Sequence, residues 1–275
     1  ALAADTAAAE LRVYPRPFVK IAGALGRTAQ AARETEIAAR LGYDAVLLSL
    51  AGWEHDADQA LLNHCRAVAE ILPLFGFYLQ PAVGGRILDY DFWRRFAEIP
   101  NVVAIKIAPF NRYHTLEVVR AVADAGRDDI ALYTGNDDSI VVDLLSRFRF
   151  GGSEHRIVGG LLGQWAVWTR RAVEMLRDLH RIRGDQAINP IWLRIANALT
   201  DANSALFDAR HGFAGCIPGI HEVLRRQGLV AGSWCLDPAE QLSPGQREEI
   251  DRVLTAYPDF SDDEFVGEHL DHWLR

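Results

Sequence analysis

The feature that most constrains the fold is a regular alternation of strand-like and helix-like runs along residues 1–165. Short apolar runs typical of strands lie at 18–23, 45–50, 75–81, 101–109, 130–135 and 156–162. Runs with the helical spacing of apolar residues lie between them, at 28–43, 56–72, 89–99, 115–126 and 138–148. Six strand–helix units in a row, with nearly continuous apolar strands, indicate a parallel sheet covered by helices.

Two architectures fit such a series, an open doubly wound sheet and a closed (β/α)8 barrel. No GxGxxG or Walker loop follows the first strands, which weakens a nucleotide-binding interpretation. The strands repeat at roughly 25 to 30 residues, as barrel units do. We therefore expect an α/β protein with a (β/α)8 TIM barrel over 1–165. A C-terminal helical extension over 166–275 should pack on it as one structural unit, because no Pro/Gly/Ser-rich linker separates the two.

Composition narrows the function classes. The net charge of −8 and the absence of a basic cluster argue against nucleic acid, and we take the arginine pairs as solvated helix faces. No apolar run reaches about 18 residues, so no membrane span is expected. Three cysteines without CxxC spacing fit a reducing, cytoplasmic setting. The first residues, "ALAADTAAAELR", resemble a helix entered partway, and we expect that the native N-terminus is missing.

Lys106 is the strongest candidate for chemistry. It lies inside the apolar run "NVVAIKIAPF", and of 29 basic residues only Lys106 and Lys20 are lysines. Lysine can act as a nucleophilic amine, whereas arginine stays charged. Because side chains alternate along a strand, Lys106 should share an inward face with Val102 and Ala104, near the strand's C-terminal end, where barrel active sites lie.

Tyr78 is the expected partner of this lysine. In the preceding strand Tyr78 alternates with Phe77 and Leu79, so we expect its side chain to point inward at a similar height. A buried amine whose pKa is lowered by desolvation can form a Schiff base with a carbonyl, and a nearby phenol can relay protons. The alternative is an inward lysine paired with a buried carboxylate, Asp137 or Asp138.

The stretch from Phe77 to Lys106, "FYLQPAVGGRILDYDFWRRFAEIPNVVAIK", resembles the core of the dihydrodipicolinate synthase/N-acetylneuraminate lyase family. That family carries Y-N-x-P on one strand and an "EIPNIVGIK"-like run ending in the Schiff-base lysine on the next. This chain has "YLQP" and "EIPNVVAIK" at the expected spacing, and "YTGNDD" is similar to the family's S-G-D-D. The resemblance spans about residues 18–260 and implies a class I aldolase or dehydratase barrel with a helical extension, usually a homotetramer.

Three departures from the family pattern stand out. The opening strands and the G-T-T/S-G-E loop that grips the substrate carboxylate have no counterpart, so "FVKIAG" resembles the third strand and the first residues the helix before it. "LAGWEHD" replaces the tyrosine expected after the fourth strand; Trp53, Glu54 or His55 would have to substitute. Val83 stands where the synthase has an arginine, with Arg86 three residues on, which disfavours dihydrodipicolinate synthesis itself.

The remaining candidates are substrate contacts. We expect Thr134 and Gly135 to shape the pocket, Asn111 to lie among specificity residues, and Gly159 to leave room for a ligand at the barrel mouth. The histidines have no metal-ligand spacing, so neither metal nor organic cofactor is expected. The prediction is a lyase that acts on a 2-oxo acid through a Schiff base on Lys106, with Tyr78 as proton relay, in a homo-oligomer (dimer or tetramer). The alternatives are a deoxy-sugar-acid dehydratase using the same imine and a non-catalytic barrel that binds a small acid.

Overall fold

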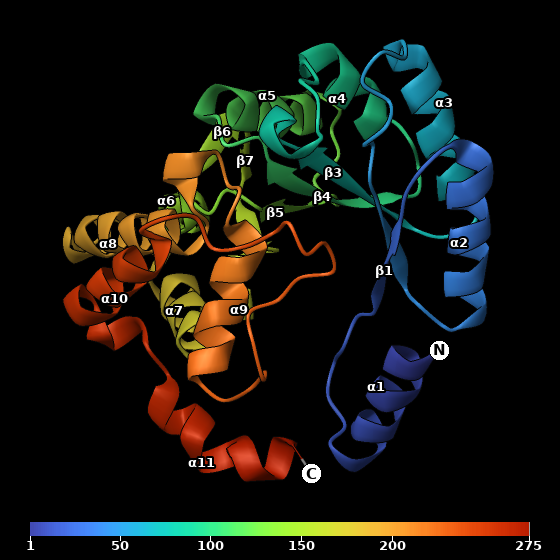
Figure 1. Ribbon diagram of the computed structural model, residues 1–275. Helices are drawn as coiled ribbons and strands as arrows, with labels where there is room; N and C mark the ends of the chain where they lie inside the picture. The colour runs from blue at the N-terminus through green and yellow to red at the C-terminus, as the bar shows by residue number, and fades with distance from the viewer. Residues whose placement is uncertain (275) are drawn as a thin grey trace. The chain divides into compact units, whose positions relative to one another are not determined.

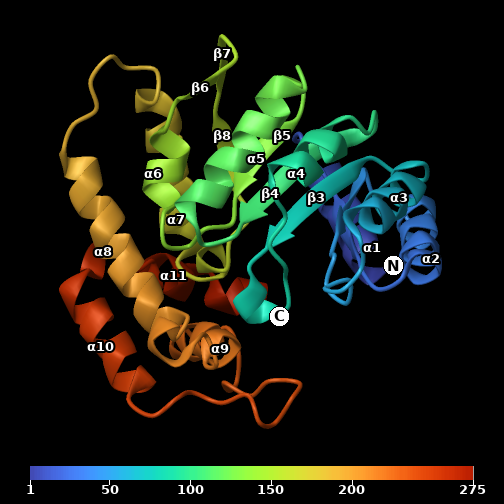
Figure 2. The same cartoon turned by 90° about the horizontal axis from the view of Figure 1, so that it is seen from above.

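The computed structural model describes residues 1–274, and the chain forms two compact units (Figures 1 and 2). The first unit holds Ala1–Tyr133 and Arg147–Val158, and the second holds Thr134–Ser146 and Gly159–Arg275. Each unit is described by itself below. The predicted division of the chain at residue 165 stays a prediction.

The first unit carries the sheet. Its strands are β1 (Ile21–Ala24), β2 (Ala45–Leu48), β3 (Leu74–Leu79), β4 (Val102–Ala108), β5 (Ala131–Thr134), β6 (Phe148–Phe150), β7 (Ser153–His155) and β8 (Ile157–Gly160). The last residues of β5 and β8 fall in the second unit. Its helices are α1 (Leu2–Val13), α2 (Thr28–Arg40), α3 (Asp58–Ala69), η1 (Pro81–Val83), α4 (Tyr90–Ala97) and α5 (Arg112–Asp124). Every strand and helix predicted up to residue 135 is present, with ends that differ by a few residues.

Six of these strands form one parallel sheet in the order β1-β2-β3-β4-β5-β8. Helices α2, α3, α4 and α5 follow one another along one side of the strands (Figure 1). The predicted α/β class and parallel sheet are confirmed. The order matches the predicted barrel without its first strands, because β1 is the "FVKIAG" segment that resembles the family's third strand.

The helix side of the sheet is tightly packed around α4. Trp93, Phe92 and Phe96 are fully buried there, and Asp89 caps the helix by accepting a hydrogen bond from the Phe92 N–H at 2.9 Å. Position 76 in β3 must be glycine, because a Cβ there would lie 2.7 Å from the Phe96 ring. The absent side chain therefore sets how closely α4 approaches the sheet.

A register shift lies between β3 and β4. Leu74 pairs with Val102, but Phe75 pairs with Ala104, so Val103 has no partner in β3. Val103 is 39% exposed, unlike its neighbours in the strand. An extra residue of this kind moves all later pairs by one position, which changes the residues that share a face.

A short antiparallel hairpin was missed. β6 and β7 pair through Phe148–His155, Arg149–Glu154 and Phe150–Ser153, whereas the sequence predicts a helix over 138–148. Gly151 and Gly152 form the turn with φ of 58° and 88°. Two glycines between short alternating runs are a hairpin signal, because this turn needs positive φ at both positions.

The second unit is helical. Its elements are α6 (Ile140–Leu145), η2 (Gln164–Ala166), α7 (Thr169–Ile182), α8 (Ile191–Leu206), η3 (Ala209–His211), α9 (Cys216–Arg226), α10 (Gln246–Ala256), η4 (Pro258–Phe260) and α11 (Asp263–Trp273). Its core is a cluster of buried apolar side chains from α8, α9, α10 and the residue that follows α8, including Leu206, Phe207, Val223, Ile250 and Val253. The helical character predicted beyond residue 165 is confirmed.

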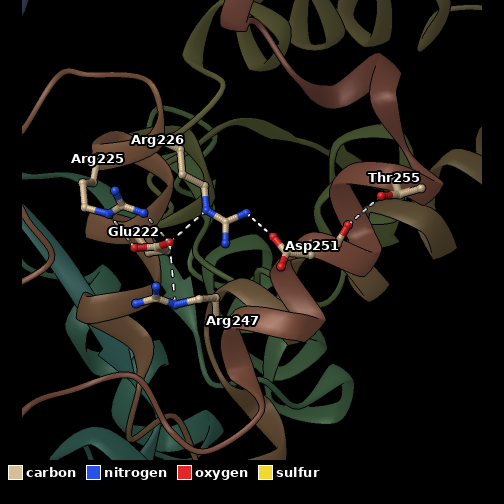
Figure 3. Close-up of polar contacts among 6 residues, drawn as sticks. All are labelled: Glu222, Arg225, Arg226, Arg247, Asp251 and Thr255. Atoms are coloured by element: carbon tan, nitrogen blue, oxygen red, sulfur yellow. Dashed lines mark hydrogen bonds and ion pairs between the residues drawn. The ribbon is translucent and has the colours of Figure 1, made fainter.

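A buried carboxylate joins α9 to α10 within this unit (Figure 3). Glu222 is fully buried and accepts hydrogen bonds from Arg225 and Arg226 at 2.9 Å. Arg247 lies 4.0 Å away, and Arg226 also binds Asp251 on α10 at 2.5 Å. The hydrogen bonds from Arg225, followed by those from Arg226, hold the pKa of Glu222 at about 2 against the cost of burial.

Candidate active site

Lys106 lies in the C-terminal half of β4, on the face predicted from alternation. Its Nζ atom is 4.2 Å from the centroid of the Phe77 ring, and Phe77 is its partner in β3. Ile105 and Ile107 are fully buried on the opposite face, and Ile105 lies beside Gly76 close to α4. The predicted division of β4, with the bulky residues toward the helices and Lys106 away from them, is confirmed.

Two polar side chains hold the start of β4 in place. The Asn101 amide donates to the Ala69 carbonyl at 2.7 Å, which ties the strand to the end of α3. The Arg127 guanidinium donates to the carbonyls of Ala97 at 2.7 Å and Val102 at 2.9 Å, at the junction of α4 and β4. Sequence reasoning missed Arg127. It anchors the strand that carries the lysine.

The predicted inward orientation of Tyr78 is wrong. Tyr78 pairs with Ile107 rather than with Lys106, because the register shift after Leu74 moves each later partner by one residue. Paired residues of neighbouring strands share a face, so Tyr78 lies on the helix side and Phe77 lies beside Lys106. With unshifted pairing Tyr78 would have been opposite Lys106, as the sequence suggested.

Tyr78 is part of the helical layer. Its side chain is fully buried, with its ring 5.2 Å from that of Trp93 on α4 and 6.0 Å from that of His114 on α5. Its hydroxyl oxygen accepts a hydrogen bond from the Leu88 N–H at 3.2 Å. Burial raises the pKa of Tyr78 to about 12. The proton-relay role of Tyr78 stays a prediction, and this orientation does not support it.

Aromatic rings form the surface around Lys106. Phe75 precedes Phe77 by two residues and therefore lies on the same face of β3. Its ring centroid is 5.2 Å from that of Tyr133 on β5. Lys106 is thus on a face built from Phe75, Phe77 and Tyr133. Tyr133 is not among the predicted site residues; strand alternation points it away from the direction of its neighbour Thr134.

Thr134 and Gly135 lie at the end of β5, within the second unit. Thr134 is fully buried, and its hydroxyl donates to the Asp143 carboxylate on α6 at 2.6 Å. Asn136 donates to the same carboxylate at 3.0 Å. The threonine side chain therefore closes a turn onto α6. The predicted role of Thr134 and Gly135 in shaping the pocket stays a prediction.

Asn111 and Gly159 have local structural roles. Asn111 is exposed and caps α5, since its Oδ1 accepts hydrogen bonds from the N–H groups of Tyr113 at 2.9 Å and His114 at 3.3 Å. Gly159 is buried in β8, within the second unit. Their predicted contacts with substrate stay predictions. The alternative pairing of Lys106 with Asp137 or Asp138 also stays a prediction.

The residues that depart from the family pattern stabilise a loop. Trp53 is buried, stacks on His64 with ring centroids 4.6 Å apart, and donates to the Gly26 carbonyl at 3.1 Å. Arg86 donates to the carbonyls of Trp53 at 3.0 Å and Asp56 at 2.7 Å and binds Asp58 at 2.9 Å. Through these contacts Trp53 and Arg86 hold the loop between β2 and α3 in place.

Among residues 1–274, no three or more His, Cys, Asp or Glu side chains are grouped so as to hold a metal ion. No helix in the same range has both the length and the apolar character that crossing a membrane requires.

Comparison with known proteins gives one family. The model of the dihydrodipicolinate synthetase family matches residues 18–257. A 4-hydroxy-tetrahydrodipicolinate synthase from Synechocystis sp. is 33% identical over 231 residues, which cover 82% of this chain and 68% of that protein. The synthase from Acaryochloris marina is 36% identical over 121 residues, covering 43% of this chain and 40% of that protein. For the Cyanothece sp. synthase the match covers 52% of the relative, so these two matches span about half or less of the relatives' length.

Solved structures share the fold. Dihydrodipicolinate synthase from Thermotoga maritima has a TM-score of 0.71 at 19% identity, covering 93% of this chain and 81% of that one. The synthase from Acinetobacter baumannii complexed with pyruvate has a TM-score of 0.69 at 24% identity, covering 91% of this chain and 77% of that one. A prophage protein of the same family from E. coli K12, in complex with pyruvate, has a TM-score of 0.70 at 17% identity, covering 92% of this chain and 80% of that one.

Proposed function

Because the chain belongs to the dihydrodipicolinate synthetase family, we propose that it is a class I lyase that acts on a 2-oxo acid through a Schiff base on Lys106. The observation that carries the proposal is the placement of Lys106. Its amine lies on an aromatic face of a parallel sheet, in the C-terminal half of β4, within the run "EIPNVVAIK". Active sites of such barrels lie at the C-terminal ends of the strands.

The chemistry of this surface supports an imine. The Phe77 ring lies 4.2 Å from the Lys106 amine, and Phe75 and Ala104 belong to the same face of the sheet, so apolar surface lines part of the site. A neutral lysine amine attacks the C2 carbonyl of the acid, and loss of water leaves a C=N bond. That bond withdraws electrons from C3, so that a carbon–carbon bond can form or break there.

The proposal covers the 2-oxo acid half of the reaction. The Arg86 guanidinium already donates to the carbonyls of Trp53 and Asp56 and to the Asp58 carboxylate. We therefore assign Arg86 no contact with a second substrate. Pyruvate is the natural first compound to test, because two structural neighbours were solved in complex with it. We also propose that the protein is a homo-oligomer, a dimer or tetramer. Size-exclusion chromatography with light scattering will measure its molar mass.

The test is trapping of the imine. Wild-type protein incubated with pyruvate and borohydride should gain the mass of one pyruvate, less water and plus two hydrogens, in intact-mass spectrometry. Lys106→Arg should gain nothing, because guanidinium does not form a stable imine. The chain offers a matched control, since Lys20 is the other lysine of the whole sequence: Lys20→Arg should be trapped as completely as wild type.

Each alternative has its own result. An adduct that survives in Lys106→Arg and disappears in Lys20→Arg would show that Lys20, rather than Lys106, forms the imine. No adduct on folded wild-type protein with any 2-oxo acid would overturn the lyase assignment and favour a non-catalytic barrel.

A further inference from the structure

The second unit contains a cavity of about 580 Å³ among its own helices. Its walls come from α7, α8 and the segment that runs from the end of α10 through η4, and η2 supplies one further residue, Gln164. The volume lies within the range of small-molecule sites, about 300 to 1,000 Å³. None of the lining residues takes part in the chemistry proposed for Lys106.

Aromatic and aliphatic side chains form most of the cavity wall. Its aromatic members are Trp192 on α8 and the pair Tyr257 and Phe260, whose ring centroids are 5.7 Å apart. The Tyr257 hydroxyl donates to the Asp201 carboxylate on α8 at 2.6 Å, which holds this ring in place. Rings fixed in this way suit a flat ligand, because aromatic faces stack on one another.

One buried polar side chain of the lining lacks a protein partner. Gln164 is 3% exposed, and its side-chain amide makes no hydrogen bond to any residue within 1–274, although its backbone N–H donates to Asp137 at 3.1 Å. The other polar residues of the lining are half-buried or exposed. Buried polar groups are normally hydrogen-bonded, because leaving one unpaired costs stability. The unpaired amide of Gln164 therefore calls for a partner from outside the chain.

Gln246 shows what a structural glutamine does in the same unit. It is 2% exposed, its Oε1 accepts from the Ser243 N–H at 3.1 Å, and its Nε2 donates to the Gly215 carbonyl at 3.0 Å. Both ends of this amide thus join separate parts of the chain. Gln164 is buried to a similar degree, but its amide joins nothing among the described residues, so the fold does not account for it.

We propose that this cavity binds a flat nitrogen heterocycle whose edge carries a hydrogen-bond donor beside an acceptor. The glutamine amide presents the acceptor Oε1 and the donor Nε2 side by side, and it pairs with such an edge through two hydrogen bonds, as in the recognition of adenine. The rings of Trp192, Tyr257 and Phe260 supply faces against which the heterocycle packs. The inference goes beyond the imine chemistry proposed for Lys106 and does not depend on it.

Saturation-transfer NMR with adenine, cytosine and nicotinamide tests the inference, because each of these probes carries the donor–acceptor edge. We expect wild type to bind at least one of the three. Gln164→Leu keeps most of the side-chain volume but loses both hydrogen bonds, so the affinity for that probe should fall about tenfold or more in titration calorimetry. Ala198→Phe places a ring in the cavity wall and should abolish binding of all three probes. Indole offers a donor without an adjacent acceptor, so any binding of indole should be the same in wild type and Gln164→Leu.

Thermal unfolding of the variants without probe separates a binding role from a structural one. Gln164→Leu should unfold at or above the wild-type midpoint, because an apolar side chain of similar size replaces an unpaired polar one. Gln246→Leu is the matched control and should unfold well below that midpoint, since it leaves the Ser243 N–H and the Gly215 carbonyl without their partner. Lys106→Arg should bind the probes as wild type does, whatever the outcome of imine trapping.

Three results would each overturn the inference. The first is that none of the three probes binds wild type, and the second is that binding is undiminished in Gln164→Leu. Either would leave water as the partner of the Gln164 amide. The third is a loss of stability in Gln164→Leu as large as that in Gln246→Leu, which would make the amide structural. Failure to trap an imine with pyruvate would overturn the proposed function and leave this inference intact.

Discussion

At the level of single residues, chemistry could be predicted where composition singled out a side chain. Lys106 was identifiable because 27 of the 29 basic residues are arginines and this lysine lies in an apolar run. Its face followed from alternation within one strand, which is a local property. Tyr78 was misplaced because its face relative to Lys106 depends on pairing between two strands, and no local pattern encodes the unpaired Val103.

The titration of His64 predicts how the stability of the protein depends on pH. It is buried, stacked on Trp53, and its Nδ1 lies 3.0 Å from the Thr28 hydroxyl. Burial, aided by the positive charge of Arg27, lowers its pKa from 6.5 to about 4. Because the folded pKa is the lower one, the unfolded chain takes up the proton first. Stability is therefore full above pH 6.5 and is lost as pH falls toward 4.

Thermal unfolding between about pH 7.5 and pH 5 measures this effect. The midpoint of wild type should fall across that range, and the fall should be smaller in His64→Gln, whatever the variant's stability at neutral pH. His55→Gln, in the exposed loop nearby, is the control and should follow wild type. An undiminished fall in His64→Gln would show that other groups cause the acid sensitivity.

At the level of elements, strands and helices were predictable because their apolar periodicities are strong. The errors came at junctions. The helix expected over 138–148 ends at Leu145 because Phe148 begins the hairpin β6–β7. The Gly151–Gly152 turn was a usable signal that the longer helical pattern overrode. Asn111 likewise reads as a specificity residue in sequence, whereas its position directly before α5 makes it a cap.

The Glu222 cluster predicts how α9 and α10 are held together. Removing the charge in Glu222→Gln leaves Arg225 and Arg226 without their carboxylate, and we expect a loss on the order of 3 kcal/mol in the free energy of unfolding, measured in urea. Glu249→Gln removes a carboxylate from an exposed pair with Arg252 and should cost no more than about 1 kcal/mol. Equal losses would show that burial of Glu222 does not strengthen its interactions.

The same carboxylate adds an acid-dependent contribution. Its pKa is about 2 in the folded protein against 4.5 as the ordinary value, so its stabilisation is present above pH 4.5 and is lost as pH falls toward 2. This window lies below that of His64, which separates the two in a titration of stability. In Glu222→Gln the lower part of the acid transition should flatten.

At the level of the whole molecule, the sequence indicated a parallel sheet with a helical extension, and the fold class and family are confirmed. Six successive strand–helix units made the class predictable. Which side chains meet across strands was not, because it depends on register and on small residues such as Gly76 and Ala104. The proposed function therefore depends most on the position of Lys106 on the face of the sheet that carries Phe77.

A crystal structure of the borohydride-reduced pyruvate complex tests that statement most directly. We expect density continuous with the Lys106 Nζ atom and lying against the Phe77 ring. Density joined to Lys20, or an adduct on Lys106 that lies away from the Phe77 ring, would contradict it.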